Sequence, residues 1–327
     1  WWTSLASADF NGDGRPDYAA GNAGLNTPYH ADAAHPTLLF YGRFGGPALL
    51  IEADYEGDRV YPRSTLRALG SYIPALRRRV TKNDEYGRMT LDQVLGADRL
   101  AAAQRFAATE LQSGVFLSQP DGTYRFAPLP RIAQVAPLQG LVAGDFDGDG
   151  RADLYAVQNS YAPIPWIGRF DGGLSQLLQG DGHGGFTPVE PMRSGLIVPG
   201  DAKALVTLDL DADGWPDFVV SRNNSTGLAW RNAGAPGRHS FRVVLQGRAG
   251  NPTAVGARIT VELADGATQS GEIAAGSGYY SQSAPACFFG WPDGNAPRRV
   301  RVRWPDGAAT AQDLVFPPPS TLVLTSP

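Results

Sequence analysis

Apolar and polar residues alternate along most of this chain, in short runs separated by glycine-rich turns. The alternation is clear at residues 115–118, 257–263 and 300–304. A period of two places successive side chains on opposite faces of a strand, so the pattern predicts a mainly β chain of short strands. Asp-Gly pairs, as at residues 121–122 and 306–307, favour the tight turns of β-hairpins.

One stretch, about residues 60–113, departs from this alternation. Its composition shifts to Ala, Leu, Arg and Gln, and its apolar residues take helical spacing, which predicts an amphipathic helix pair broken near Gly96. The positions that carry this prediction are Leu91, Val94, Leu95, Leu100, Phe106 and Leu111. Residues 60–105 hold nine basic and four acidic side chains. We interpret this charge excess as a solvated helix face rather than as a polyanion site.

Three nine-residue segments repeat one acidic pattern, and each lies between two short apolar runs. They begin at Asp9, Asp145 and Asp209, and each has Asp or Asn at positions 1, 3, 5 and 9 and Gly at position 6. The repeated unit is therefore a strand, an acidic loop and a second strand. The first two copies lie 136 residues apart and the last two 64 apart. The helical stretch is therefore predicted to be an insertion.

The crowded carboxylates of these loops repel one another, which disfavours the folded loop unless a cation lies among them. Oxygen ligands without His or Cys select a hard ion, and a flexible loop suits Ca²⁺ better than Mg²⁺. Position 12 is Ala20, Ala156 or Val220 and the flanks are strands, which excludes an EF-hand. We therefore predict about three Ca²⁺ sites. Their predicted ligands are Asp9, Asn11, Asp13, Asp17, Asp145, Asp147, Asp149, Asp153, Asp209, Asp211, Asp213 and Asp217.

The acidic pattern stops before about residue 235, and the remaining chain alternates strongly. Asp-Gly turns at residues 265–266 and 293–294 separate short strands, and the whole region is typical of a small β-sandwich. The sequence thus predicts a repeat region over residues 1–234 and a β-sandwich over residues 235–327.

Composition narrows the class of protein. Hydrophobic residues make up 43% of the 327 residues and charged residues 18%, so the chain can bury a core and is not disordered. It has no apolar run of about 18 residues, so we expect no membrane span. The single cysteine, Cys287, excludes an intrachain disulfide, and the net charge of −4 favours no nucleic-acid partner. The opening Trp1-Trp2, without Met or a leader pattern, leads us to expect a processed or excised piece.

Sequence motifs typical of enzyme active sites are weak or absent in this chain. The four histidines, His30, His35, His183 and His239, are scattered along the chain. Residues 180–185 fit the GxGxxG dinucleotide pattern, but a predicted strand follows where a helix is required. The sequence contains no nucleophile elbow and no Walker loop. We therefore expect no enzymatic activity.

At the three acidic loops the chain resembles the FG-GAP/VCBS type of repeat, which also builds the head of the integrin α-subunit. The resemblance covers residues 1–234 and implies β-propeller blades in which the acidic loop joins two strands and holds Ca²⁺. Propellers typically have about four to eight blades, and this region is long enough for only three or four, which implies a partial propeller. Residues 38–52 look like a fourth blade core that has lost the carboxylates and hence the metal.

The C-terminal region resembles the ASPIC/UnbV module, which follows such repeats in many large secreted bacterial proteins. The matching residues are Asn251, 255–258, 276–279, 281–283, 289–290 and 302–305. The sequence departs from the family at Cys287-Phe288, where a His usually precedes Phe-Gly. The resemblance implies a secreted protein that is extracellular or held at the cell surface.

These features predict an extracellular calcium-binding structural or adhesion protein, which could be a subunit of a surface or fibrous assembly. The unpaired edge of an incomplete propeller favours pairing with another protein or another copy of the chain. The alternative is a carbohydrate-binding or carbohydrate-active propeller protein with a glycan as partner. Its candidate stacking residues are Tyr161, Trp166, Trp215 and Tyr279.

Overall fold

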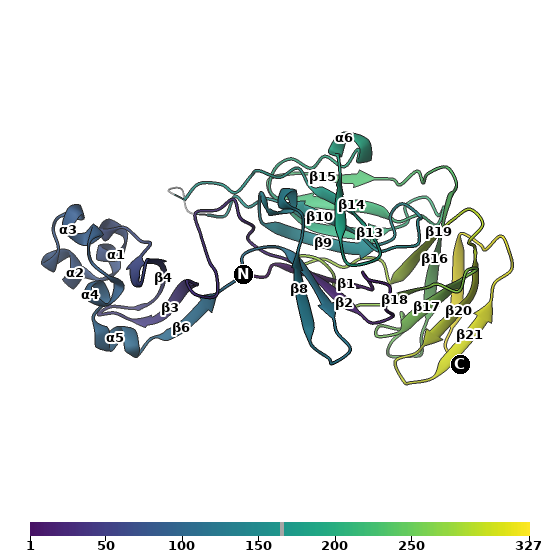
Figure 1. Cartoon of the computed structure of the whole chain (residues 1–327), viewed down its shortest axis with the longest axis horizontal. Coiled ribbons are helices and arrows are strands. Elements are labelled where there is room, and N and C mark those ends of the chain that lie inside the picture. Colours follow the sequence, from purple (N-terminus) through teal and green to yellow (C-terminus); the bar gives the residue numbers. More distant parts are fainter. Residues whose placement is uncertain (164–166) are drawn as a thin grey trace. The chain divides into compact units, whose positions relative to one another are not determined.

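The computed structural model (Figure 1) describes residues 1–163 and 167–327. Trp166, one of the candidate stacking residues, lies outside the described residues. Within them the chain is mainly β, as predicted, with several sheets and short helices. None of the helices in these two ranges is long and apolar enough to cross a membrane.

The chain divides into two units. The first unit comprises Trp1 and residues 27–111. The second comprises residues 2–26 and 112–327, so most of the first unit is an insertion between two strands of the second. Each unit has its own hydrophobic core.

The first unit packs one antiparallel sheet, in the order β5-β4-β3-β6, against short helices. Its strands are Thr37–Arg43 (β3), Ala48–Glu56 (β4), Arg59–Pro62 (β5) and Gln104–Ala108 (β6). Its helices are Leu66–Tyr72 (α1), Pro74–Arg79 (α2), Asn83–Gly87 (α3), Leu91–Leu95 (α4) and Ala97–Ala101 (α5). Leu38, Phe40 and Ile51 of the sheet share a buried core with Leu76 and Leu91 of the helices. The helices therefore cover the apolar face of the sheet.

This packing corrects two predictions. The prediction of a fourth blade core at residues 38–52 is wrong, because these strands belong to the first unit and share their buried core with its helices. Gly96, with φ +90°, separates α4 from α5 as predicted. The helical spacing fails beyond α5, because residues 104–108 pair with β3 as a strand and leave Phe106 exposed.

Three antiparallel sheets of the second unit carry the acidic loops, in the orders β1-β2-β7-β8, β9-β10-β11-β12 and β13-β14-β15. Their strands are Ser4–Ala8 (β1), Asp17–Gly21 (β2), Gly114–Ser118 (β7), Tyr124–Pro128 (β8), Leu138–Gly144 (β9), Asp153–Gln158 (β10), Gln176–Gly180 (β11), Phe186–Val189 (β12), Ala202–Leu208 (β13), Asp217–Arg222 (β14) and Ser225–Trp230 (β15). A 3₁₀ turn, Arg131–Gln134 (η1), and a short helix, Pro191–Ser194 (α6), lie between strands. The hairpin predicted at the Asp-Gly pair 121–122 is confirmed as β7–β8, and β11 and β12 form a second hairpin.

These three sheets pack against one another in chain order. Strand β1 contacts β9, and β9 contacts β13. Leu117 of the first sheet shares a core with Leu154 of the second, and Val157 of the second shares another core with Phe218 of the third. The strands in the described ranges form no closed ring.

The C-terminal part of the second unit has two sheets, in the orders β19-β16-β22 and β18-β17-β20-β21. Their strands are Arg238–Gln246 (β16), Arg258–Leu263 (β17), Thr268–Glu272 (β18), Ala286–Pro292 (β19), Pro297–Arg303 (β20), Ala309–Asp313 (β21) and Thr321–Thr325 (β22). Phe241 and Phe289 of one sheet share a core with Ile259 and Val300 of the other. The two sheets around one core form a β-sandwich, and we call this part the C-terminal sandwich.

Candidate metal centre

Each acidic loop joins the first strand of a sheet to the second. Loop 1 (residues 9–17) joins β1 to β2, loop 2 (residues 145–153) joins β9 to β10, and loop 3 (residues 209–217) joins β13 to β14. The two strands on either side of each loop pair antiparallel. The predicted order of strand, acidic loop and strand is therefore confirmed for all three copies.

In loops 1 and 2 the first aspartate accepts hydrogen bonds from backbone N–H groups of the turn. Asp9 accepts hydrogen bonds from the backbone N–H groups of Gly12, Asp13 and Gly14, at 2.8–3.1 Å. Asp145 accepts the three corresponding bonds in loop 2, at 2.7–3.1 Å. Positions 4 and 6 of the turn need positive φ, here +74° and +80° in loop 1, which glycine adopts without steric cost.

The last aspartate of the loop has a second role that the sequence analysis missed. Asp153 is buried and accepts hydrogen bonds from the backbone N–H groups of Phe146, at 3.0 Å, and Gly180, at 2.9 Å. It therefore ties loop 2 to β11, the third strand of its sheet. Asp17 and Asp217 make equivalent bonds in their sheets. The amides that they bind belong to Phe10, Ser118, Leu210 and Asn232.

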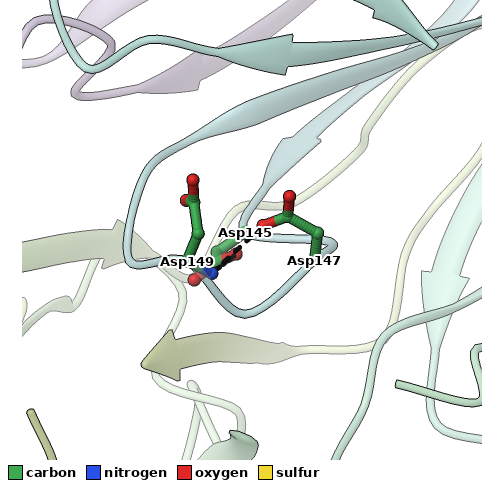
Figure 2. Close-up of side chains that lie close together, drawn as sticks. All are labelled: Asp145, Asp147 and Asp149. Atoms are coloured by element: carbon green, nitrogen blue, oxygen red, sulfur yellow. Dashed lines mark hydrogen bonds between the residues drawn. The ribbon is translucent and has the colours of Figure 1, made fainter. Parts of the chain in front are cut away.

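Loop 2 brings three carboxylates together (Figure 2). Asp145, Asp147 and Asp149 each offer an oxygen, and these atoms lie within 4.8 Å of one another. Burial raises the pKa of Asp145 to about 7, and the neighbouring carboxylates add to the shift. Burial likewise raises the pKa of Asp153 to about 8. Their charged forms are costly here, and a bound cation would offset that cost.

Loop 3 also gathers carboxylates but differs in its turn. Oxygens of Asp209, Asp211 and Asp217 lie within 4.8 Å of one another. Position 4 is Ala212, which keeps a positive φ of +63° where the other loops have glycine. Oδ1 of Asp209 is buried and has no hydrogen-bond partner among the described residues. An unpartnered buried carboxylate oxygen beside two other carboxylates fits the ligand set of a hard cation.

The carboxylates of loop 1 are less closely grouped than those of the other two loops. Asn11 Nδ2 donates a hydrogen bond to Asp13 Oδ2 at 2.8 Å, and Arg15 forms an ion pair with the same carboxylate at 2.5 Å. In the described part of the chain its acids form no group of three as close as those in the other loops. The structure therefore brings together six of the twelve predicted ligands: Asp145, Asp147, Asp149, Asp209, Asp211 and Asp217.

The C-terminal sandwich packs against all three loops, which the sequence analysis did not predict. Arg258 donates to the position 6 carbonyl of loop 1 at 2.8 Å, and Ser240 donates to the position 6 carbonyl of loop 3 at 2.9 Å. Gly290 lies against loop 2, where a Cβ on it would stand 2.3 Å from Asp145 Oδ2. These contacts join residues far apart in sequence, and no local pattern points to them.

The aromatic residues considered for glycan stacking are mostly engaged with neighbours. Trp215 is half-buried and packs beside loop 2. The guanidinium of Arg169 lies over the ring of Tyr161, 4.3 Å from its centroid. Tyr279 lies edge-on to Tyr280, which is almost fully exposed. Tyr280 was not among the predicted stacking residues, and its ring is open to a ligand.

Comparison with protein families identifies one region. Residues 247–324 match the ASPIC and UnbV family, and this match lies within the predicted C-terminal module. The acidic-loop region is not part of the match. The predicted boundary between residues 234 and 235 stays a prediction.

Two curated proteins that share one name are similar to part of this chain. Cartilage acidic protein 1 of Mus musculus is 25% identical over 200 residues, which is 59% of this chain and 30% of that protein. The Homo sapiens protein of that name is 24% identical over 200 residues, 59% of this chain and 29% of that protein. The match thus spans less than a third of the relatives' length. The crystal structure of the V. cholerae biofilm matrix protein Bap1 aligns with 96% of this chain and 51% of that chain, at 11% identity and a TM-score of 0.17. A TM-score this low does not indicate a shared fold.

Proposed function

We propose that the acidic loops bind Ca²⁺ and that the bound ions stabilise an extracellular structural or adhesion protein. The observation that carries this proposal is the close group of three carboxylates in loop 2 and again in loop 3, each with one buried member. All their ligand atoms are oxygens, which suits a hard cation, and irregular loops suit the variable coordination of Ca²⁺. Loop 1 shares the pattern and would close around an ion with Asp9, Asn11, Asp13 and Asp17.

The packing of the three loop-bearing sheets supports a propeller arrangement of the FG-GAP/VCBS type. Successive sheets share cores, and their first strands adjoin, as in blades arranged around an axis. The first sheet carries a cluster of aromatic rings, in which Trp2 lies 5.4 Å from Phe116 and 6.2 Å from Phe126. Trp2 is 50% exposed. A further blade, or a second copy of the chain in a surface or fibrous assembly, would cover this cluster.

The extracellular location rests on two supports. Extracellular calcium modules work at weak affinity, with Kd about 10⁻⁴–10⁻³ M, because the ion is abundant outside cells. Arginines that pair with loop carboxylates, such as Arg15 and Arg231, weaken cation binding and so suit that range. The relatives named for cartilage and acidic character agree with a secreted or cell-surface protein.

Thermal unfolding with Ca²⁺ and with excess chelator tests this function. A site whose Kd is tenfold below the free Ca²⁺ concentration adds about 1.4 kcal/mol, so three sites add about 4 kcal/mol. For the second unit we expect Tm to rise by roughly 10 °C in Ca²⁺. Mg²⁺ at the same concentration should give a much smaller rise.

A pair of matched variants assigns this stabilisation to the loops. Asp149→Asn removes one charge of the loop 2 group, whereas Asp171→Asn removes an exposed charge outside the loops. The first variant should lose part of the calcium-dependent rise and the second should keep all of it. Equal Tm values in Ca²⁺ and chelator for the unaltered chain would refute calcium stabilisation.

A cavity in the second unit favours glycan binding as a second candidate function. Its volume is about 860 Å³, and β1, β9 and β18 contribute to its walls. The lining offers hydroxyl, amide and carboxylate groups that suit a hydroxyl-rich ligand. They belong to Ser7, Tyr18, Gln269, Ser270, Glu272 and Gln282. Binding to a glycan array that persists in chelator would favour this candidate over a purely calcium-dependent structural role.

A further inference from the structure

An arginine of the C-terminal sandwich reaches the first aspartate of loop 3. Arg242 lies on β16, which pairs in parallel with β22. Its Nη1 stands 3.4 Å from Oδ2 of Asp209. The side chain of Asp209 is 0% exposed and that of Arg242 only 23%. This charge pair is therefore largely shielded from water, where electrostatic interactions are stronger than at the surface.

The ion pair leaves part of the hydrogen-bonding capacity of both Asp209 and Arg242 unused. Oδ1 of Asp209 and Nε of Arg242 are both buried without a hydrogen-bond partner in the described ranges. Arginine–carboxylate ion pairs frequently form two short parallel hydrogen bonds. The single long contact here leaves a carboxylate oxygen of Asp209 open for another positive ligand.

Arginines at the other loops are placed differently. Arg15 of loop 1 and Arg151 of loop 2 belong to the loops themselves, and their side chains are 40% and 54% exposed. Arg231, which pairs with Asp211 of loop 3, is also exposed. Such side chains can turn into water when a cation binds. Arg242 cannot do so as freely, because its side chain is only 23% exposed.

From these contacts we propose that Arg242 competes with a cation for Asp209 and makes loop 3 a weaker site than loop 2. The inference rests on the proposed calcium function. A cation that uses Oδ1 of Asp209 lies close to the guanidinium, and the two positive charges repel one another in a region of low exposure. Loop 3 therefore fills after loop 2 as the Ca²⁺ concentration rises. Because Arg242 belongs to the C-terminal sandwich, filling loop 3 and the docking of the sandwich influence each other.

Calcium titration of the whole chain by calorimetry tests this inference. Arg242→Gln removes the charge, and we expect loop 3, seen as one of the weak sites, to bind Ca²⁺ about tenfold more tightly. Arg242→Lys keeps the charge and should leave that site weak. Arg301→Gln is the matched control, because Arg301 pairs with the exposed Glu262 on the C-terminal sandwich rather than with an acidic loop. Arg242→Met, which keeps the aliphatic length, replaces the Gln variant if that protein is unstable.

The outcomes separate the inference from the function on which it rests. If the unaltered chain binds no Ca²⁺, the proposed function is refuted. If it binds Ca²⁺ and Arg242→Gln tightens none of the sites, the competition is refuted. If the Gln and Lys variants tighten the site equally, packing and not charge controls the affinity, which also overturns the inference.

Discussion

Replacing Gly290 by alanine is expected to destabilise the second unit by about 3 kcal/mol, at the upper end of the usual cost of overpacking a core. A Cβ at this position would stand 2.3 Å from Asp145 Oδ2 and 2.6 Å from Gly148 Cα. Backbone atoms of a tight turn cannot yield as a flexible side chain can. Loop 2 or β19 must therefore shift, which separates the C-terminal sandwich from loop 2 and lowers the affinity of loop 2 for Ca²⁺.

Denaturant unfolding of matched glycine variants measures this effect. Gly227 also lies in a strand, and a Cβ on it would meet its nearest neighbour, the carbonyl of Val220, at 3.4 Å. Gly227→Ala should change the free energy of unfolding by less than about 1 kcal/mol. If Gly290→Ala is no more destabilising than this control, the close approach of the C-terminal sandwich to loop 2 is wrong.

Replacing Asp153 by alanine should cost about 3 kcal/mol even in the presence of chelator. The substitution leaves the backbone N–H groups of Phe146 and Gly180 without their acceptor in a buried site. A buried donor left unsatisfied costs about 1–3 kcal/mol. Since the loss doesn't involve a metal, it separates the structural role of Asp153 from any role as a ligand.

The control for this variant is an aspartate in an exposed turn. Asp121 accepts hydrogen bonds from the backbone N–H and the hydroxyl of Thr123, at 2.9 and 2.7 Å, near solvent. Asp121→Ala should cost less than about 1 kcal/mol, because water can replace the lost acceptor. A loss below 1 kcal/mol for Asp153→Ala in chelator would mean that position 9 serves only the metal.

The sequence predicted the features that depend on local chemistry. The acidic loops stand out because three copies share carboxylates at the same positions, and such loops fold between neighbouring strands. The hairpin β7–β8 follows from the Asp-Gly pair at residues 121–122, whose glycine has φ +83°. The β-sandwich follows from strict alternation, as in β17, where buried residues alternate with partly exposed ones.

The predictions that failed, and the contacts that were missed, depend on which elements pack together in the folded chain. Residues 38–52 alternate as any half-covered sheet does, and nothing in that pattern says whether helices or a second sheet cover it. Residues 104–108 have helical spacing, but pairing with β3 provides their backbone hydrogen bonds. The contacts of Gly290 and Arg242 with the acidic loops join segments far apart in the chain, so periodicity holds no information about them.

Counting bound Ca²⁺ per chain is the most direct test of the central claim. The whole chain would be dialysed to equilibrium against about millimolar free Ca²⁺, the range of extracellular modules, and the bound ion measured by elemental analysis. The account predicts about three ions per chain, with fewer in Asp149→Asn and the full number in Asp171→Asn. A chain that binds no Ca²⁺ at this concentration would contradict it.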